Sequence, residues 1–175
     1  MKTDNIERYL NSFGKYIVKQ SRTNLTKGKK NVSKELYNSI SFKVITDADG
    51  FSVQFYMADY GTFIDKGVSG NKQTRRYKDY TGKTVTSPYK YTTKQPPSRL
   101  LDKWVVKRGI APRDKKGRFV SRKSISFLIA RSIKVKGIKS TSFFQRPMQL
   151  GLKNFSKDLL GNLKVDIMNS LKIEK

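Results

Sequence analysis

The stretch between residues 40 and 57 carries the pattern that most restricts the fold of this chain. Apolar and polar side chains alternate over residues 40–44 and again over residues 51–57, and the sequence DADG at 47–50 separates the two runs. This pattern predicts a β-hairpin with one apolar face. Because an isolated hairpin is only marginally stable in water, we expect a helix to cover that face.

Two long segments with helical periodicity flank the hairpin. Residues 5–26 repeat apolar side chains at helical spacing, with Thr3 or Asp4 as the expected N-cap. Residues 147–172 predict a second long helix, which we expect to begin with Pro147 in its first position. The sequence therefore predicts an α+β fold, in which a long N-terminal and a long C-terminal helix pack on a small antiparallel sheet.

A glycine-rich stretch follows the hairpin, ADYGTFIDKGVSG at residues 58–70. Tyr60, Phe63 and Ile64 share one face of a short helix, and Gly67 is a natural end for that helix. On these residues alone, the stretch is a corner that turns the chain from the sheet into an extension.

Net charge is the strongest property of the chain as a whole. Its 175 residues hold 38 lysines and arginines against 13 aspartates and glutamates, a formal charge of +25, and 36% of them are hydrophobic. Residues 66–123 carry 18 of the cations and only three of the acids. A subunit this basic attracts polyanions, so we expect an anionic partner: DNA, RNA or an acidic protein surface.

The sequence predicts one domain that spans residues 1–175. Within it, residues 68–137, which include most of the basic segment, divide into two parts. Residues 68–97 show no helical period and predict an extended basic arm or a loose hairpin, in which tyrosines alternate with cations. Such tyrosines can stack on nucleobases or hold the segment to a neighbouring subunit. Residues 98–137 predict a helical insertion, with helices at 98–108 and 122–136, the second capped by Ser121 and ended by Gly137.

The composition excludes most catalytic chemistry. Without cysteine or histidine the chain cannot form a disulfide, a thiolate metal site or a Ser-His or Cys-His nucleophile pair. Its acids are scattered, and it has no phosphate-binding loop and no zinc-finger or recognition-helix signature. We therefore expect no enzyme, no metal and no cofactor. The N-terminus and the lack of a long apolar run predict neither a secretion signal nor a membrane span.

Four segments follow one another along the chain in this order: LTKGKKNVSKELYNSISFKV, ADYGTFIDKGVSG, ISFLIARSIKVKGI and FFQRPM. Together they resemble the tail-completion or neck proteins of tailed bacteriophages. LTKGKKNVSKELYNSISFKV is similar to a run that ends in "L..SI" in that family, and ADYGTFIDKGVSG resembles its "YA..vE.GT" corner. ISFLIARSIKVKGI is similar to the family's "IA..I...GI" element, and FFQRPM resembles its "PFLRPAL" segment before the last helix. These four segments lie between residues 25 and 148, and none of them falls within residues 71–97.

The resemblance implies a structural protein of the virion neck, made in the host bacterial cytoplasm. It implies a homo-oligomeric ring, six- or twelve-fold, stacked between portal or adaptor and tail proteins, through which DNA passes. The alternative function is a non-enzymatic, basic nucleic-acid-binding protein that acts in replication or packaging. In a ring, each subunit would bring its basic segment to the same radius, where it could meet genomic DNA without reading bases, or an acidic neighbouring ring.

Two residue sets follow from these expectations. The predicted contacts with DNA or an acidic partner are Arg75, Arg76, Lys78, Lys83, Arg113, Lys115, Lys116 and Arg118. The predicted subunit-interface residues are Tyr60, Phe63, Tyr77, Tyr80, Tyr89, Tyr91, Phe144 and Arg146.

Overall fold

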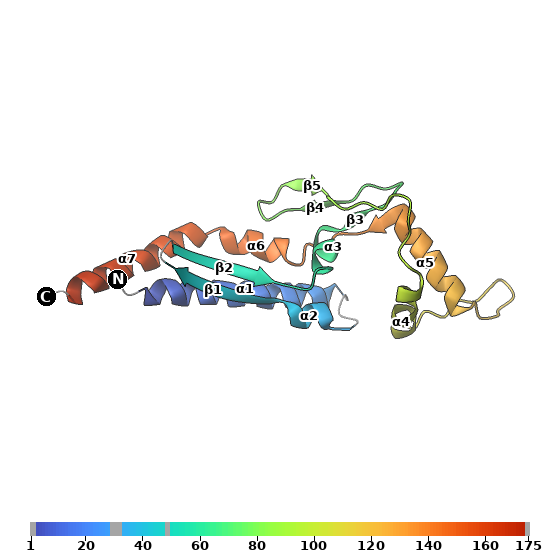
Figure 1. Cartoon of the computed structure of the whole chain (residues 1–175), viewed down its shortest axis with the longest axis horizontal. Coiled ribbons are helices and arrows are strands. Elements are labelled where there is room, and N and C mark those ends of the chain that lie inside the picture. The colour runs from blue at the N-terminus through green and yellow to red at the C-terminus, as the bar shows by residue number, and fades with distance from the viewer. Residues whose placement is uncertain (1–2, 29–32, 48–49, 174–175) are drawn as a thin grey trace.

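The computed structural model describes residues 3–28, 33–47 and 50–173. Over those residues the chain forms an elongated α+β structure with seven helices and three two-stranded antiparallel sheets (Figure 1). We call the part formed by the described residues within 3–67 and 145–173 the body, and it lies at the end that holds both termini (Figure 1). Helices α4 (Arg99–Lys107) and α5 (Arg122–Lys136) extend from the other end (Figure 1). The predicted α+β class, with long N- and C-terminal helices, is confirmed.

Helix α1 (Asp4–Lys27) is the element on which the body is built. Its buried face carries Ile6, Leu10, Ile17 and Leu25, each at most 2% exposed. The helix contacts the hairpin on one side and the two C-terminal helices on another. The helix predicted at 5–26 is therefore confirmed, and it covers the hairpin as expected.

Strands β1 (Ser41–Asp47) and β2 (Gly50–Tyr56) form the predicted hairpin, with Phe42 opposite Phe55. Two residues of the predicted turn, 48 and 49, lie outside the described residues. Gly14 allows the hairpin to approach α1, because a Cβ atom at that position would overlap the ring of Phe42. A side chain there would force the two elements apart.

The corner after the hairpin contains the expected short helix, α3 (Gly61–Lys66). Gly67 ends it with φ +74°, a left-handed conformation that glycine adopts without strain. Strand β3 (Val68–Ser69) follows and pairs with β6 (Gly137–Ile138), which comes directly after α5. The corner therefore joins the body to the base of α5.

The carboxylate of Asp65, at the end of α3, holds the start of helix α6 (Gln145–Leu152). It accepts hydrogen bonds from the backbone N–H of Phe144 at 2.9 Å and of Gln145 at 3.4 Å. Burial raises the pKa of Asp65, although these hydrogen bonds oppose the rise. Two segments that are 79 residues apart, ADYGTFIDKGVSG and TSFFQRP, thus meet at one buried carboxylate.

Residues 68–97 form a loose hairpin that lies against the body, with strands β4 (Arg76–Lys78) and β5 (Thr84–Thr86). The hydroxyl of Ser87 donates to the carbonyl of Gly67 at 2.6 Å, and Ser69 N–H donates to the carbonyl of Tyr89 at 2.8 Å. Of the two forms expected for this segment, the structure has the hairpin, and it is tied to β3.

The two helices predicted within 98–137 are confirmed as α4 and α5, which pack on each other. From here on, the name arm refers only to residues 98–136, which contain these two helices, and not to the hairpin of residues 68–97. Ser121 caps α5 by accepting a hydrogen bond from Ser124 N–H at 3.2 Å, and Gly137 ends the helix with φ +72°. The arm buries little of its own apolar surface, since only Val105, Ile125 and Ala130 among its described hydrophobic residues are buried.

The prediction of one helix over 147–172 is wrong. The chain instead forms α6 and α7 (Phe155–Ile173), separated by residues 153–154. The break lets α7 turn along α1, where the ring of Phe155 lies 4.8 Å from that of Phe13 and 5.7 Å from that of Tyr9. Pro147 is the third residue of α6, still in the first turn, where its missing N–H costs no hydrogen bond.

A second carboxylate joins the start of α1 to the C-terminal half of α7. Thr3 is the N-cap residue of α1, but its side chain accepts no capping bond. Asp166 of α7 accepts hydrogen bonds from Asn5 N–H at 3.2 Å and Ile6 N–H at 3.0 Å instead. Desolvation raises the pKa of Asp166, but these bonds and the charge of Arg8 outweigh it, so the pKa lies below its usual value.

Candidate interaction surfaces

The charge excess cannot be balanced within the subunit, because 38 cations face 13 acids. Several of those acids already hold backbone N–H groups. Asp65 and Asp166 cap helices, while Asp79 and Asp114 close turns in the basic segments. These hydrogen bonds use carboxylate lone pairs inside the fold, which leaves even fewer of the 13 acids for the surface cations.

The loop between α4 and α5 gathers four of the predicted contact residues at the far end of the arm (Figure 1). Asp114 accepts hydrogen bonds from Lys116 N–H at 2.8 Å and Arg118 N–H at 2.9 Å, and it pairs with the Arg118 guanidinium at 3.1 Å. The hydrogen bond from Arg118 N–H has the largest effect on the carboxyl group of Asp114 and lowers its pKa. Arg113 lies over the ring of Phe119, 4.1 Å from its centroid. The loop is therefore an ordered turn, and Lys115 and Lys116 are exposed on it.

The other four predicted cations lie on the β4–β5 hairpin, apart from the arm loop (Figure 1). Arg76, Lys78 and Lys83 are exposed. Arg75 is half-buried, and its Nε donates to the carbonyl of Lys136 at 2.9 Å, at the C-terminal end of α5. That bond gives Arg75 a structural role in holding the hairpin to the arm's base.

A polar hollow of about 430 Å³ lies beside the start of α6, lined by Lys78, Thr141, Ser142, Arg146 and Gln149. Its cations belong to the two predicted sets, since Lys78 is predicted to meet an anion and Arg146 a subunit. The structure brings them together, because the tip of the hairpin lies close to Gln149. Sequence reasoning missed Ser142 and Gln149, which carry no recognisable motif.

The predicted interface aromatics differ in exposure. Tyr60, Phe63 and Tyr80 are exposed, and the ring of Phe63 lies 4.5 Å from that of Tyr89. The half-buried side chains are Tyr77, Tyr89, Tyr91 and Phe144. Burial raises the pKa of Tyr91. Phe144 packs inside the subunit against Phe55, with ring centroids 5.5 Å apart.

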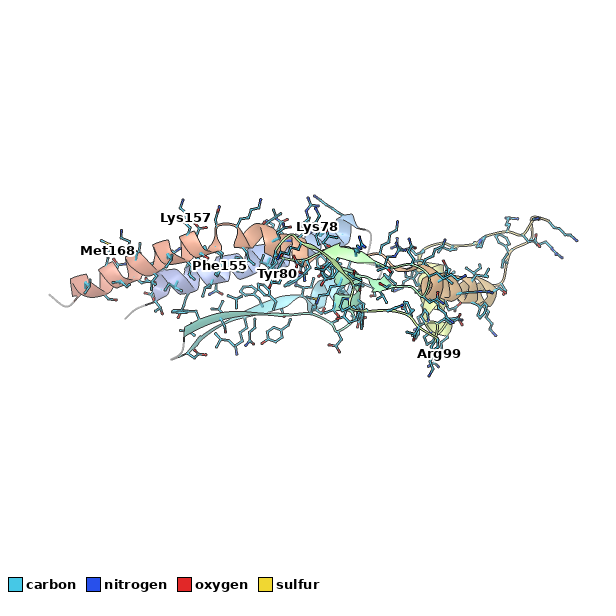
Figure 2. The ribbon with its side chains drawn as sticks, turned by 90° about the horizontal axis from the view of Figure 1, so that it is seen from above. Lys78, Tyr80, Arg99, Phe155, Lys157 and Met168 are labelled. Carbon is cyan, nitrogen blue, oxygen red and sulfur yellow. The ribbon has the colours of Figure 1, made fainter. Side chains whose placement is uncertain are left out.

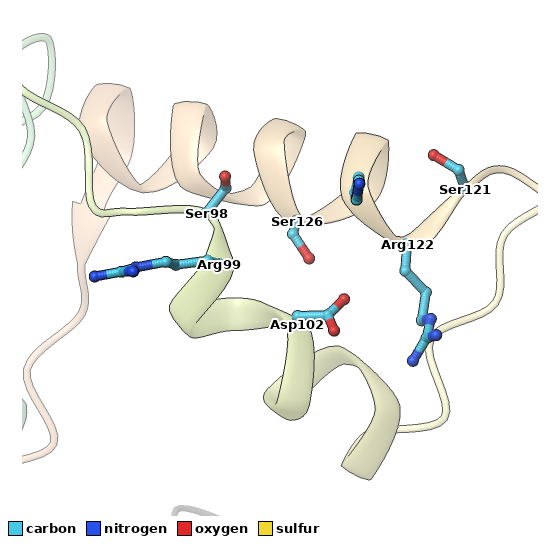
Figure 3. Close-up of a pocket in the computed structure, with 7 residues that line it drawn as sticks. Ser98, Arg99, Asp102, Ser121, Arg122 and Ser126 are labelled. Carbon is cyan, nitrogen blue, oxygen red and sulfur yellow. The ribbon is translucent and has the colours of Figure 1, made fainter.

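A groove of about 610 Å³ runs between α4 and α5 (Figure 3). Ser126 of α5 and Asp102 of α4 point toward one another across it, while Arg99 points away (Figure 3). The hydroxyl of Ser126 is buried and has no hydrogen-bond partner among the residues that the structure describes. The groove thus offers one carboxylate and one unsatisfied hydroxyl among several cations.

Large apolar side chains are exposed at both ends of the long axis. Arg99 marks the arm and Met168 marks α7 at the opposite end in Figure 2. On the arm the exposed apolar residues are Leu100, Val106, Phe119, Phe127 and Leu128. On α7 they are Leu160, Val165, Ile167, Met168 and Leu171. Leu100 and Leu171 are 68% and 65% exposed, although both belong to helices with a packed face.

The described residues contain no group of three or more acids that could hold a metal ion. None of the helices in that part of the chain has the length and apolar character needed to cross a bilayer. Comparisons of the chain with protein-family models, with curated proteins and with solved structures find no match.

Proposed function

We propose that this chain is a structural subunit of the neck, or head–tail connector, of a tailed bacteriophage. Copies would form a closed ring, six- or twelve-fold, between portal or adaptor and tail proteins, with DNA passing through it. The observation that carries this proposal is the pair of exposed apolar surfaces at opposite ends of the subunit, on the arm and on α7.

Two different apolar surfaces on one subunit suit a head-to-tail interface. If the arm of one copy covers α7 of the next, the same contact repeats around an axis and closes when the rotation permits. Exposed apolar clusters of this kind mark interaction sites. Charge favours this pairing, because α7 carries only three lysines against two aspartates, whereas the rest of the surface is strongly basic.

The contact at Asp65 supports the resemblance that suggested this function. The corner and the segment before the last helices are two of the four segments that resemble neck proteins, and a buried carboxylate joins them. They act as one structural unit, which fits a shared ancestry of the two motifs better than two chance matches do.

The test is assembly of the purified chain, followed by mass photometry and negative-stain electron microscopy over a range of concentrations, alone and with portal and tail proteins. We expect closed rings, and we expect the double variant Leu100→Ser/Leu128→Ser to lose them while its circular dichroism spectrum is unchanged. Tyr56→Thr, which changes an exposed aromatic residue outside both ends, serves as the control. Monomers under every condition would contradict the proposal and favour the alternative, a basic nucleic-acid-binding protein.

A further inference from the structure

The hollow between the β4–β5 hairpin and α6 points to a specific ligand. We propose that it binds a phosphate group of a nucleic-acid backbone, held between Lys78 and Arg146. This inference deepens the proposed function, because it names where passing DNA is gripped, and it rests on that function only for the identity of the polymer.

The two cations of the hollow have no acid of their own. Within the described residues neither Lys78 nor Arg146 forms an ion pair. Asp79, which follows Lys78 in the sequence, accepts from Thr81 N–H at 2.9 Å and Lys83 N–H at 3.0 Å, and Asp65 caps α6. Two cations thus line one hollow without a carboxylate of the described residues in direct contact with either, which favours an anionic ligand.

The donors of the hollow suit a phosphate. Arg146 offers a planar fork of N–H groups, Lys78 an ammonium, and Ser142 and Gln149 a hydroxyl and an amide. A backbone phosphate presents two non-bridging oxygens on a tetrahedral phosphorus, so it can accept from donors on different sides, whereas the two oxygens of a carboxylate lie in one plane. A volume of about 430 Å³ leaves ample room for such a group.

The backbone at the floor of the hollow is held in an unusual conformation. Ser142 has φ +46°, which non-glycine residues rarely adopt and which is concentrated at functional sites. Its N–H donates to the carbonyl of Asp65 at 3.0 Å, and the Thr141 hydroxyl donates to that of Ile64 at 2.8 Å. These bonds fix the floor in place before any ligand arrives.

The surrounding hairpin carries a further cation beside Lys78, which favours a polymer of phosphates as the ligand. On β4, Arg76 and Lys78 are two residues apart and share a face, opposite Thr86 and Thr84 of β5. Tyr77 and Val85 occupy the other face. A chain of phosphates can meet this row and the hollow together, while an isolated anion can meet only one point of it.

The experiment compares the double variant Lys78→Gln/Arg146→Gln with the wild type for binding of a short fluorescein-labelled DNA duplex of mixed sequence, as a function of salt. Both residues are exposed, so the fold should persist. We expect the Kd to rise roughly tenfold or more, and the slope of log K against log salt to fall by about one for each phosphate that the variant no longer neutralises. The control is Lys157→Gln/Lys164→Gln on α7, which removes the same charge away from the hollow and should keep the slope.

Two results would overturn the inference. One is equal behaviour of the hollow variant and the α7 control. The other is a hollow variant that keeps DNA binding but loses binding to poly-glutamate, which would assign the hollow to an acidic protein. The binding assay is run at a concentration at which mass photometry detects only monomers, so failure to form rings would not affect either reading.

Discussion

The carboxylate of Asp65 allows a direct test of how the corner after β2 holds the last third of the chain. It is 3% exposed and accepts the backbone N–H groups of Phe144 and Gln145 at 2.9 and 3.4 Å. Asp65→Ala removes the acceptor and leaves both donors without a partner. Asp65→Asn keeps an oxygen in the same place and removes only the charge.

The expected magnitudes follow from this geometry. A buried donor that loses its partner costs about 1–3 kcal/mol, and the longer bond to Gln145 contributes little. We therefore expect Asp65→Ala to lower the free energy of unfolding by about 2–3 kcal/mol. Asp65→Asn should cost less than about 1 kcal/mol, since it keeps the acceptor and removes a charge that burial disfavours.

The pH dependence has a definite sign. Burial raises the pKa of Asp65 in the folded protein above its unfolded value. Its contribution to stability is therefore fully present below the unfolded pKa, about 3.9, and is lost as the pH rises through the raised folded pKa. Because the Asn side chain does not titrate, the wild type should gain stability relative to Asp65→Asn as the pH falls through this window.

The assay is urea denaturation followed by far-UV circular dichroism over a pH series. Asp59→Asn is the matched control, because Asp59 is exposed and the change in charge is the same. If Asp65→Asn is as destabilising as Asp65→Ala, the capping argument fails. If its stability relative to the wild type changes with pH in the opposite sense, burial is not what sets the pKa of Asp65.

Two further substitutions test the packing on α1 by the same denaturation assay. Asp166→Ala should lower stability by about 1–2 kcal/mol near neutral pH through loss of a helix cap. Because the folded pKa of Asp166 is lowered, the carboxylate contributes stability above its unfolded pKa and loses it as the pH falls through the folded pKa, so this difference should shrink in acid. Gly14→Ala should destabilise by about 1–3 kcal/mol through overlap with Phe42. Gly161→Ala adds a methyl group that meets open space on α7, so it should instead stabilise the protein by up to about 1 kcal/mol. A loss of stability in Gly161→Ala, or a gain of stability in Gly14→Ala, would contradict this account.

The sequence predicted those elements whose signals are local. The structure confirms three such elements: the periodic helix α1, the alternating strands β1 and β2, and the helix α5 capped by Ser121. In each case the pattern is contained in the residues that form the element. The break between α6 and α7 was missed because contact with α1 decides it. Gly151 lies so close to α1 that an added Cβ would be 2.9 Å from the Phe13 ring, and no residue at 153–154 is a helix breaker.

The two long-range caps were missed for a related reason. Each joins groups far apart in the sequence, and no short motif specifies them. One partial signal did exist: α6 begins after Phe144, which has no side-chain acceptor, so the first N–H groups of α6 had to find an acceptor outside the N-cap residue. In the same way, the cations of the hollow could be found singly from the sequence, but their convergence depends on how the hairpin folds back over α6.

Helices α1 and α7 pack on each other, and the bonds to Asp166 place the first turn of α1 beside the C-terminal half of α7. In Figure 1 both termini lie at the end farthest from the arm. An affinity tag at either terminus would therefore leave the α4–α5 loop unobstructed. Subunits attached to a sensor surface by such a tag would all present that loop outward, so its binding to DNA or to an acidic protein could be measured in a uniform orientation.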